Sequence, residues 1–148
     1  MLTYRTASEE ETIALGERLA AELPARGVVL LIGNLGAGKT TLAKGIAHGR
    51  GAAQHDEVSS PTFTLIHEYG PEPQQGGASL YHIDLYRLDE ARQVATLGLE
   101  DLFDRDALVL IEWGERFPEL FPAQRTEIYL RTAPGKPDER EIEVRQLT

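Results

Sequence analysis

Two adjoining stretches decide the fold: Gly27-Val-Val-Leu-Leu-Ile32 and, directly after it, Gly33-Asn-Leu-Gly-Ala-Gly-Lys-Thr40. The first is a continuous apolar run, which is typical of a β-strand buried on both faces of a sheet. The second is rich in glycine, and the helical spacing of Leu42 and Ile46 predicts a helix over Thr40–His48 behind it. A strand, a glycine-rich loop and a helix in this order favour an α/β fold.

The loop matches the pattern G-x-x-x-x-G-K-[ST] of phosphate-binding loops, and the strand and the helix stand where the mechanism requires them. Glycine lets the backbone curl until successive N–H groups point at phosphate oxygens. Lys39 can then reach the β- and γ-phosphates, and the hydroxyl of Thr40 can ligate Mg²⁺. The pattern predicts a nucleoside triphosphate site formed by Gly33, Asn34, Leu35, Gly36, Ala37, Gly38, Lys39, Thr40 and Thr41. The alternative is a glycine-rich turn with a chance Lys-Thr pair.

A phosphate-binding loop needs a second group that positions the metal, and the usual source is an acid at the end of another buried strand. The run Ala107–Glu112 supplies one, because five apolar residues end on Glu112. In open α/β sheets, ligands bind at this carboxyl end of the strands. The usual residue is Asp, so the longer side chain of Glu112 predicts metal contact through water or ligation from slightly further back. An ordinary solvent-facing glutamate is the alternative.

A central segment, His82-Ile-Asp-Leu-Tyr-Arg87, places its His, Asp and Tyr on one face of a predicted strand. A polar stripe on an interior strand costs free energy unless it meets partners or solvent. Asp84 is therefore a candidate to order water near the γ-phosphate or the metal, or to act as a weak general base. The preceding segment Val58–Thr62 offers Thr62 as a sensor of the γ-phosphate, as in switch GTPases. A solvated strand face and a strand-entry turn are the respective alternatives.

The remaining elements predict a mixed architecture. Ser8 and Glu11 form a capping box, and leucines at helical spacing follow up to Pro24. We expect further strands over 62–69, 78–86, 126–132 and 140–147 and a helix over 89–97. Because βα units alternate with hairpins, the prediction is a P-loop NTPase-like three-layer α/β sandwich with a mixed central β-sheet.

Length and composition set the outer limits. The 148 residues suit a single domain over 1–148, and the formal net charge of −9 argues against broad binding to a nucleic-acid backbone. The sequence has no cysteine, which excludes disulfides and thiol nucleophiles and is compatible with a cytoplasmic location. No apolar stretch approaches the roughly 18 residues of a membrane span, so we expect no membrane partner.

The segments GNLGAGKTTL, VSSPTFTL, YHIDLYRL and LVLIEW, in this order and spacing, resemble the TsaE (YjeE) family. This resemblance implies a bacterial ATPase subunit of the machinery that makes tRNA threonylcarbamoyladenosine. It implies ATP and Mg²⁺ as cofactors, slow hydrolysis by the subunit alone, and action with a transferase complex of TsaB and TsaD type. That complex modifies adenosine 37 in tRNAs reading codons that begin with A, so tRNA contact is expected mainly through the partners.

The same resemblance assigns roles to particular residues. Lys39 and Thr40 hold phosphate and metal, and Glu112 matches the acid that ligates Mg²⁺. Asp84 matches the essential acid of the central segment, and Thr62 matches the switch-like loop. The segment near Ser8 matches the region that contacts the base of the nucleotide.

Three other functions fit the sequence less well. A switch GTPase needs Asn-Lys-x-Asp to read guanine, but the only asparagine is Asn34, inside the phosphate loop. A small-molecule kinase of the P-loop class needs an acceptor site and usually an arginine-bearing lid. Here Arg87, Arg92 and Arg105 are scattered along the chain. A nucleotide-binding module without activity would gain nothing from Asp84.

Overall fold

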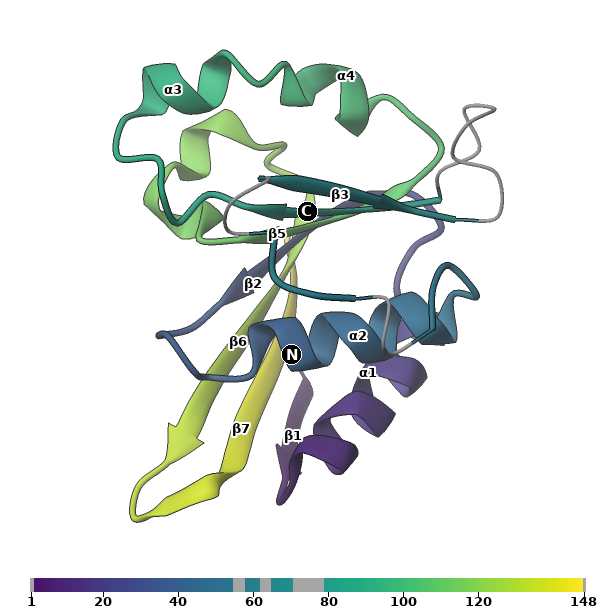
Figure 1. The fold of residues 1–148 in the computed structure, drawn as a ribbon, viewed down its shortest axis with the longest axis vertical. Coiled ribbons are helices and arrows are strands. Elements are labelled where there is room, and N and C mark those ends of the chain that lie inside the picture. The colour runs from purple at the N-terminus through teal and green to yellow at the C-terminus, as the bar shows by residue number, and fades with distance from the viewer. Residues whose placement is uncertain (1, 55–57, 62–64, 71–78, 148) are drawn as a thin grey trace.

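The computed structural model describes residues 2–54, 58–61, 65–70 and 79–147. Within these ranges, strands form one mixed seven-stranded sheet in the order β1-β7-β6-β2-β5-β4-β3 (Figure 1). The four central strands are parallel to one another, whereas the outer strands pair antiparallel. The strands are β1 (Leu2–Thr6), β2 (Gly27–Ile32), β3 (Ile66–Tyr69), β4 (Leu80–Asp84), β5 (Leu108–Glu112), β6 (Arg125–Ala133) and β7 (Lys136–Leu147).

Helices cover both faces of the sheet. One face packs against α1 (Glu9–Glu22) and α2 (Lys39–Gly49), and the other against α3 (Ala91–Ala95), α4 (Leu99–Phe103) and the 3₁₀ helices η3 (Gly114–Arg116) and η4 (Pro118–Leu120). β2 shows the division directly, since Val29 and Leu31 belong to the core beneath α1 and α2, and Val28 and Leu30 to the opposite core. The predicted three-layer α/β sandwich with a mixed sheet is confirmed.

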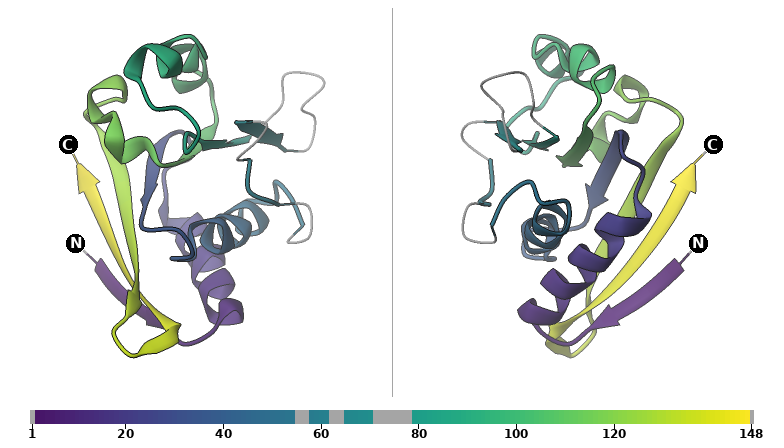
Figure 2. Two further views of the ribbon diagram at one scale, coloured as in Figure 1. Left: turned by 60° about the vertical axis from the view of Figure 1, so that its left-hand side comes forward. Right: turned by 90° about the vertical axis from the view of Figure 1, so that its right-hand side faces the viewer.

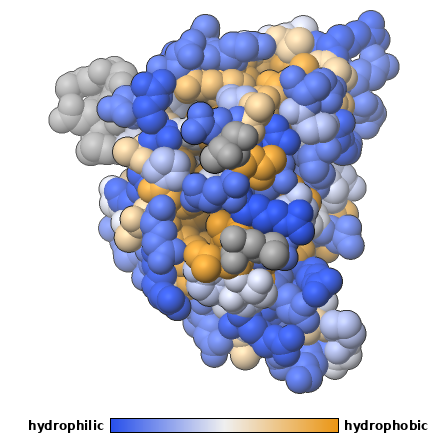
Figure 3. Space-filling model, turned by 180° about the vertical axis from the view of Figure 1, so that it is seen from behind, coloured by the Kyte–Doolittle hydropathy of each residue, from blue (hydrophilic) through white to orange (hydrophobic). Residues whose placement is uncertain are grey.

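The two halves of the sheet are covered unequally. Figure 2 shows β1, β7 and β6 with α1 and α2 on one side only, while α3 and α4 lie over the other half. The uncovered face carries ion pairs between long side chains, such as Arg131 with Glu141 and Arg125 with Glu127. Hydrophilic residues also cover most of the face seen in Figure 3. In the described part of the chain, no helix has both the length and the apolar character needed to cross a membrane.

Several element boundaries differ from the sequence-based expectations. The strand expected over 78–86 ends at Asp84, because the backbone N–H of Tyr86 turns back to donate to Asp84 Oδ1 at 2.8 Å. The helix expected over 89–97 is confined to Ala91–Ala95, and α4 was not anticipated. The sequence did not predict β1 either. This strand is short and largely exposed, and it is held by pairing with β7, which lies more than a hundred residues away in the sequence.

The start of α1 follows the predicted capping box with one change. The Ser8 hydroxyl accepts from the N–H of Glu11 at 3.1 Å, as expected. The Glu11 carboxylate, however, accepts from the N–H of Ala7 at 2.9 Å, one residue earlier than in the usual box. Both bonds fix the direction in which the chain leaves β1 and enters the helix.

Glycines let α1 and α2 approach closely. A Cβ atom added to Gly45 would lie 2.1 Å from the carbonyl oxygen of Ile13, and one added to Gly16 would lie 2.5 Å from that of Leu42. Both obstacles are backbone atoms, which cannot rotate away. The contact brings the N-terminal end of α1 beside the first turn of α2, where the pocket described below begins.

We therefore expect Gly45→Ala to lower the free energy of unfolding by about 1–3 kcal/mol, the usual cost of overpacking. In an open helix the same change would stabilise by about 1 kcal/mol. Urea denaturation measures the difference, with Lys44→Ala at the neighbouring position as the control. A Gly45→Ala protein as stable as the control would contradict the close packing of the two helices.

Candidate functional site

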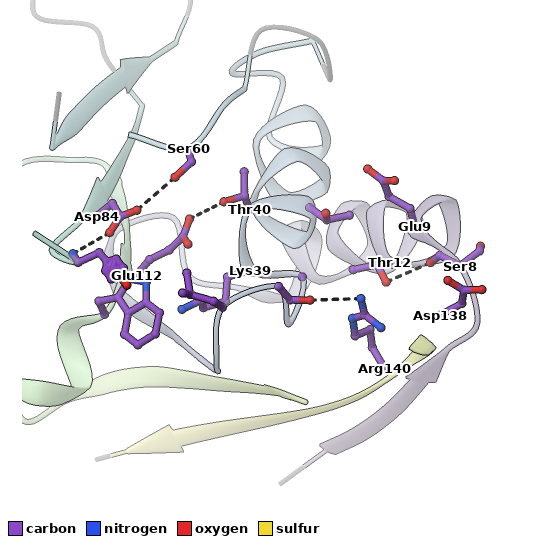
Figure 4. A pocket seen from close by; sticks show the side chains of 16 residues that line it. Ser8, Glu9, Thr12, Lys39, Thr40, Ser60, Asp84, Glu112, Asp138 and Arg140 are labelled. Carbon is purple, nitrogen blue, oxygen red and sulfur yellow. Dashed lines mark hydrogen bonds between the residues drawn. The ribbon is translucent and has the colours of Figure 1, made fainter. Parts of the chain in front are cut away.

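A pocket of about 390 Å³ opens at the carboxyl ends of β2, β5 and β4 (Figure 4). Its walls come from the glycine-rich loop, the first turn of α2, the N-terminal end of α1, the ends of β4 and β5, and the start of β7. Volumes of this order suit a small-molecule ligand. The position agrees with the general location of ligand sites in open α/β sheets.

The glycine-rich loop ends where α2 begins. Gly38 precedes the helix with φ of +103°, a left-handed conformation that side chains disfavour, and no side chain caps the helix. The first N–H groups of an α-helix have no partner within the helix and carry its positive dipole end. The N-terminus of α2 therefore faces the pocket as a site suited to anions.

Lys39 is buried at the floor of the pocket. Its Nζ atom donates to the carbonyl of Gly33 at 2.7 Å and lies 3.5 Å from the ring centroid of Trp113. Burial lowers the pKa of Lys39 below its usual value, and the charges of Glu112, Glu115 and Asp84 oppose that shift. The side chain is thus a cation held by a carbonyl and an aromatic ring inside the loop.

Thr40 and Glu112 meet across the pocket. The Thr40 hydroxyl donates to Glu112 Oε2 at 3.0 Å, which joins the first turn of α2 to the end of β5. Glu112 is only 3% exposed. A hydroxyl and a carboxylate at this separation fit the oxygen ligands that Mg²⁺ takes beside phosphate groups. Among the described residues, no group of three His, Cys, Asp or Glu side chains forms a self-sufficient metal site.

Asp84 lies next to Glu112, because the two residues are paired in the parallel register of β4 and β5. Its Oδ2 accepts from the Ser60 hydroxyl at 3.2 Å, and its Oδ1 accepts from the N–H of Tyr86. The residue is 2% exposed. These donors hold the Asp84 carboxyl group in place at the pocket wall, which is the arrangement that a water-orienting group or weak base requires.

Trp113 forms a strained aromatic wall. It has a φ of +67°, unusual for a residue with a side chain, and its ring stacks on that of Tyr86 with centroids 5.1 Å apart. The same ring contacts the Lys39 ammonium. The turn after β5 thus directs Glu112 and Trp113 to the same pocket.

The opposite wall comes from β7. Arg140 Nη2 donates to the carbonyl of Gly36 at 3.2 Å, so a residue from the end of the chain braces the glycine-rich loop. Asp138 and Glu9 line this end of the pocket beside Ser8 (Figure 4).

The structure brings most of the predicted site residues to one pocket. Those that line it are Ser8, Leu35, Gly36, Gly38, Lys39, Thr40, Thr41, Asp84 and Glu112. Gly33, Asn34 and Ala37 do not line the pocket. The backbone carbonyl of Gly33 accepts from Lys39, and that of Asn34 accepts from the N–H of Ala37. Ala37 itself is buried within the loop. Thr62 lies outside the described residues. The ligand roles of all these residues remain predictions.

Other residues at the site escaped the sequence analysis. Arg140 and Asp138 carry no signal, because only the β6–β7 hairpin brings them to the loop. Ser60 had a visible signal in its Ser-Ser-Pro-Thr segment, which was interpreted through Thr62 alone. His82 was assigned to the polar stripe without a role, although it contacts Glu112.

Glu115 is a half-buried carboxyl behind the site. Its Oε1 is buried without a hydrogen-bond partner in the described part of the chain. Burial raises the pKa of Glu115 above its usual value, against a hydrogen bond from its own backbone and the charges of Lys39 and Arg116. Ionising this carboxyl therefore costs the folded protein more than it costs the unfolded chain.

A carboxyl with a raised pKa binds more protons when folded, so the free energy of unfolding falls as pH rises from its unfolded pKa of 4.5 through the folded value. Glu115→Gln keeps the shape but cannot ionise. We expect the variant to gain melting temperature relative to the unmodified protein as pH rises through that range. Exposed Glu119 on η4 provides the control, Glu119→Gln. If the melting temperatures of Glu115→Gln and the unmodified protein changed in parallel with pH, burial would not raise the pKa of Glu115.

Comparison with known proteins agrees with this geometry. A family model described as threonylcarbamoyl adenosine biosynthesis protein TsaE matches residues 6–142. The tRNA threonylcarbamoyladenosine biosynthesis protein TsaE of Bacillus subtilis (strain 168) is 40% identical over 141 residues, which cover 95% of this chain and 83% of the relative. The protein of the same name from Nostoc sp. is 46% identical over 116 residues, covering 76% of this chain and 67% of the relative.

A solved structure extends the likeness to three dimensions. The crystal structure of YdiB from Bacillus subtilis matches with a TM-score of 0.76 at 35% sequence identity, covering 99% of this chain and 86% of that one. The family resemblance carried by the sequence motifs is thereby confirmed, and the chain belongs to the TsaE family of tRNA threonylcarbamoyladenosine biosynthesis proteins.

Proposed function

We propose that this chain is a Mg²⁺-dependent ATP-binding and ATP-hydrolysing subunit required for threonylcarbamoyl modification of adenosine 37 in tRNAs reading codons that begin with A. It acts through a partner transferase complex of TsaB and TsaD type, as one cytoplasmic domain over residues 1–148. The observation that carries the proposal is the contact of the Thr40 hydroxyl with Glu112 Oε2, 3.0 Å apart beside the glycine-rich loop. Family membership supplies the pathway.

The charge of the pocket supports a metal-bound nucleotide. Lys39 and Arg140 are its cations, whereas Glu9, Asp84, Glu112 and Asp138 are carboxylates. A bare triphosphate would add several negative charges to an already acidic pocket. Glu112 would hold a divalent cation, and the charge of that cation would offset the repulsion between the acidic pocket and ATP.

The roles of the residues follow from their positions. The N–H groups of the loop and of the first turn of α2 bind the phosphates, and Lys39 turns from the Gly33 carbonyl to the β- and γ-phosphates. Thr40 and Glu112 would hold Mg²⁺, which when bound neutralises charge that develops on the phosphate oxygens. Asp84 orients the attacking water and accepts its proton.

The acidic surface supports the assignment of tRNA binding to partners. The chain carries a formal net charge of −9, and on its open sheet face Arg125, Arg131 and Arg145 each pair with a glutamate. Contact with a nucleic-acid backbone depends on unneutralised Lys and Arg side chains. The proposal includes slow ATP hydrolysis by the free subunit and stimulation of that hydrolysis by the partner proteins.

Lys39→Ala should weaken binding of Mg-ATP by roughly 10- to 150-fold, because it removes one charge-assisted contact worth about 1.5–3 kcal/mol. Isothermal titration calorimetry measures the affinity. Lys44→Ala, on the same helix outside the pocket, should bind like the unmodified protein. Unchanged affinity in Lys39→Ala would remove the glycine-rich loop from the proposed site.

Reconstitution with the partner transferase and tRNA tests the function itself. We expect repeated turnovers of tRNA modification only when this chain and ATP are present. Asp84→Ala should still bind Mg-ATP but support no repeated turnover, while Asp106→Ala, in the exposed bend before β5, should behave normally. Normal modification without this chain would overturn the function, and normal modification with Asp84→Ala would overturn the role of Asp84.

A separate assay with γ-labelled ATP and a pool of metabolites distinguishes the proposal from a small-molecule kinase. A hydrolase releases inorganic phosphate into water, whereas a kinase moves labelled γ-phosphate onto an acceptor. Transfer of label to metabolites without release of phosphate would favour the kinase.

A further inference from the structure

A buried histidine stands behind the acid of the site. His82 on β4 has no exposed surface and does not line the pocket, so it does not contact the proposed nucleotide. Its Nε2 lies 2.6 Å from Glu112 Oε2. Its Nδ1 is also buried and has no hydrogen-bond partner among the described residues. Within the described part of the chain, the contact with Glu112 is therefore the one polar contact of this ring.

The hydrogen atom in that contact can be assigned by chemistry. An ionised carboxylate accepts hydrogen bonds and donates none, so Nε2 carries the hydrogen and donates it to Glu112. The Thr40 hydroxyl donates to the same Oε2 atom. Within the described residues, both hydrogen bonds of this carboxylate thus fall on one oxygen, which leaves Oε1 for another ligand.

We propose that His82 is a positioning residue: through its Nε2–H it holds the Glu112 carboxylate in the orientation that meets Thr40 and presents a free oxygen to the metal. The inference rests on the proposed function and adds a residue that contacts neither nucleotide nor metal. Short charge-assisted hydrogen bonds in a buried site are strong and directional. Outer partners of this kind commonly orient metal ligands.

This role accounts for glutamate at position 112. Compared with aspartate, which is usual at this place, glutamate has an additional rotatable bond and loses more conformational entropy when it is fixed. The parallel register sets His82 opposite Leu110, two residues before Glu112 on the neighbouring strand. From there the imidazole reaches the end of the longer side chain and fixes it before any ligand arrives.

Substitutions at His82 test the proposal through the cation dependence of ATP affinity, measured by calorimetry with EDTA and with increasing Mg²⁺. His82→Leu removes the donor, and His82→Gln places an amide N–H close to the same position. We expect His82→Leu to bind ATP normally in EDTA but to need about 10- to 100-fold more Mg²⁺ for the same gain in affinity. His82→Gln should recover most of that loss.

A matched control is the neighbouring histidine. His67 on β3 is paired with His82 in the antiparallel register but contacts Tyr69. His67→Gln should leave the Mg²⁺ requirement unchanged. A folded His82→Leu protein with the Mg²⁺ requirement of the unmodified protein would overturn the role of His82. If the ATP affinity of the unmodified protein did not depend on Mg²⁺, the proposed metal site would be wrong.

A second measurement needs no ligand and no substitution. Nitrogen-15 NMR of the histidine rings in the nucleotide-free protein should show His82 with its hydrogen on Nε2. A ring with a bare Nε2 and its hydrogen on Nδ1 could not donate to Glu112 and would overturn the proposal. This result stands even if His82→Leu fails to fold.

Discussion

The contact between Thr40 and Glu112 is the constraint on which the site depends. It joins the N-terminal turn of α2 to the carboxyl end of β5, through two residues that are 72 positions apart in the sequence. Parallel pairing of β2 with β5 makes it possible, because the loop after β2 and the acid that ends β5 then emerge at the same edge of the sheet. The N-terminal end of α2, which suits anions, and the carboxylate that we propose as a metal ligand thus face one another across a single pocket.

The charged and polar side chains around that contact are buried, which strengthens their interactions. Lys39, His82, Asp84 and Glu112 are all nearly inaccessible to solvent, and each charged group has an oppositely polarised partner. In such surroundings unpaired charges are costly, whereas fixed donors and acceptors retain their orientation. The polar side chains of the pocket therefore hold one another in place: the cation contacts a carbonyl, and the carboxylates accept from hydroxyl, backbone and imidazole donors.

Elements outside the central strands bring further residues to the pocket. Close packing of α1 on α2 through Gly16 and Gly45 carries Ser8 and Glu9 to the pocket. The β6–β7 hairpin delivers Arg140 to the carbonyl of Gly36 from the other side. The pocket has more carboxylates than cations, which is consistent with the proposed Mg²⁺-bound nucleotide, and the acidic surface is consistent with the proposal that partners hold the tRNA.

The sequence by itself determined what depends on neighbouring residues. The apolar run before a glycine-rich loop, the capping residue Ser8 and the acid at the end of 107–112 are local patterns, and they were enough for the α/β class, the phosphate-binding motif and the family. Only the tertiary structure decided which distant residues meet. Arg140 joins the loop, His82 holds Glu112, and β1 forms at all because strand pairing and helix packing bring those segments together. No local pattern encodes such contacts, since their free energy comes from partners that lie far along the chain and approach only when the sheet is complete.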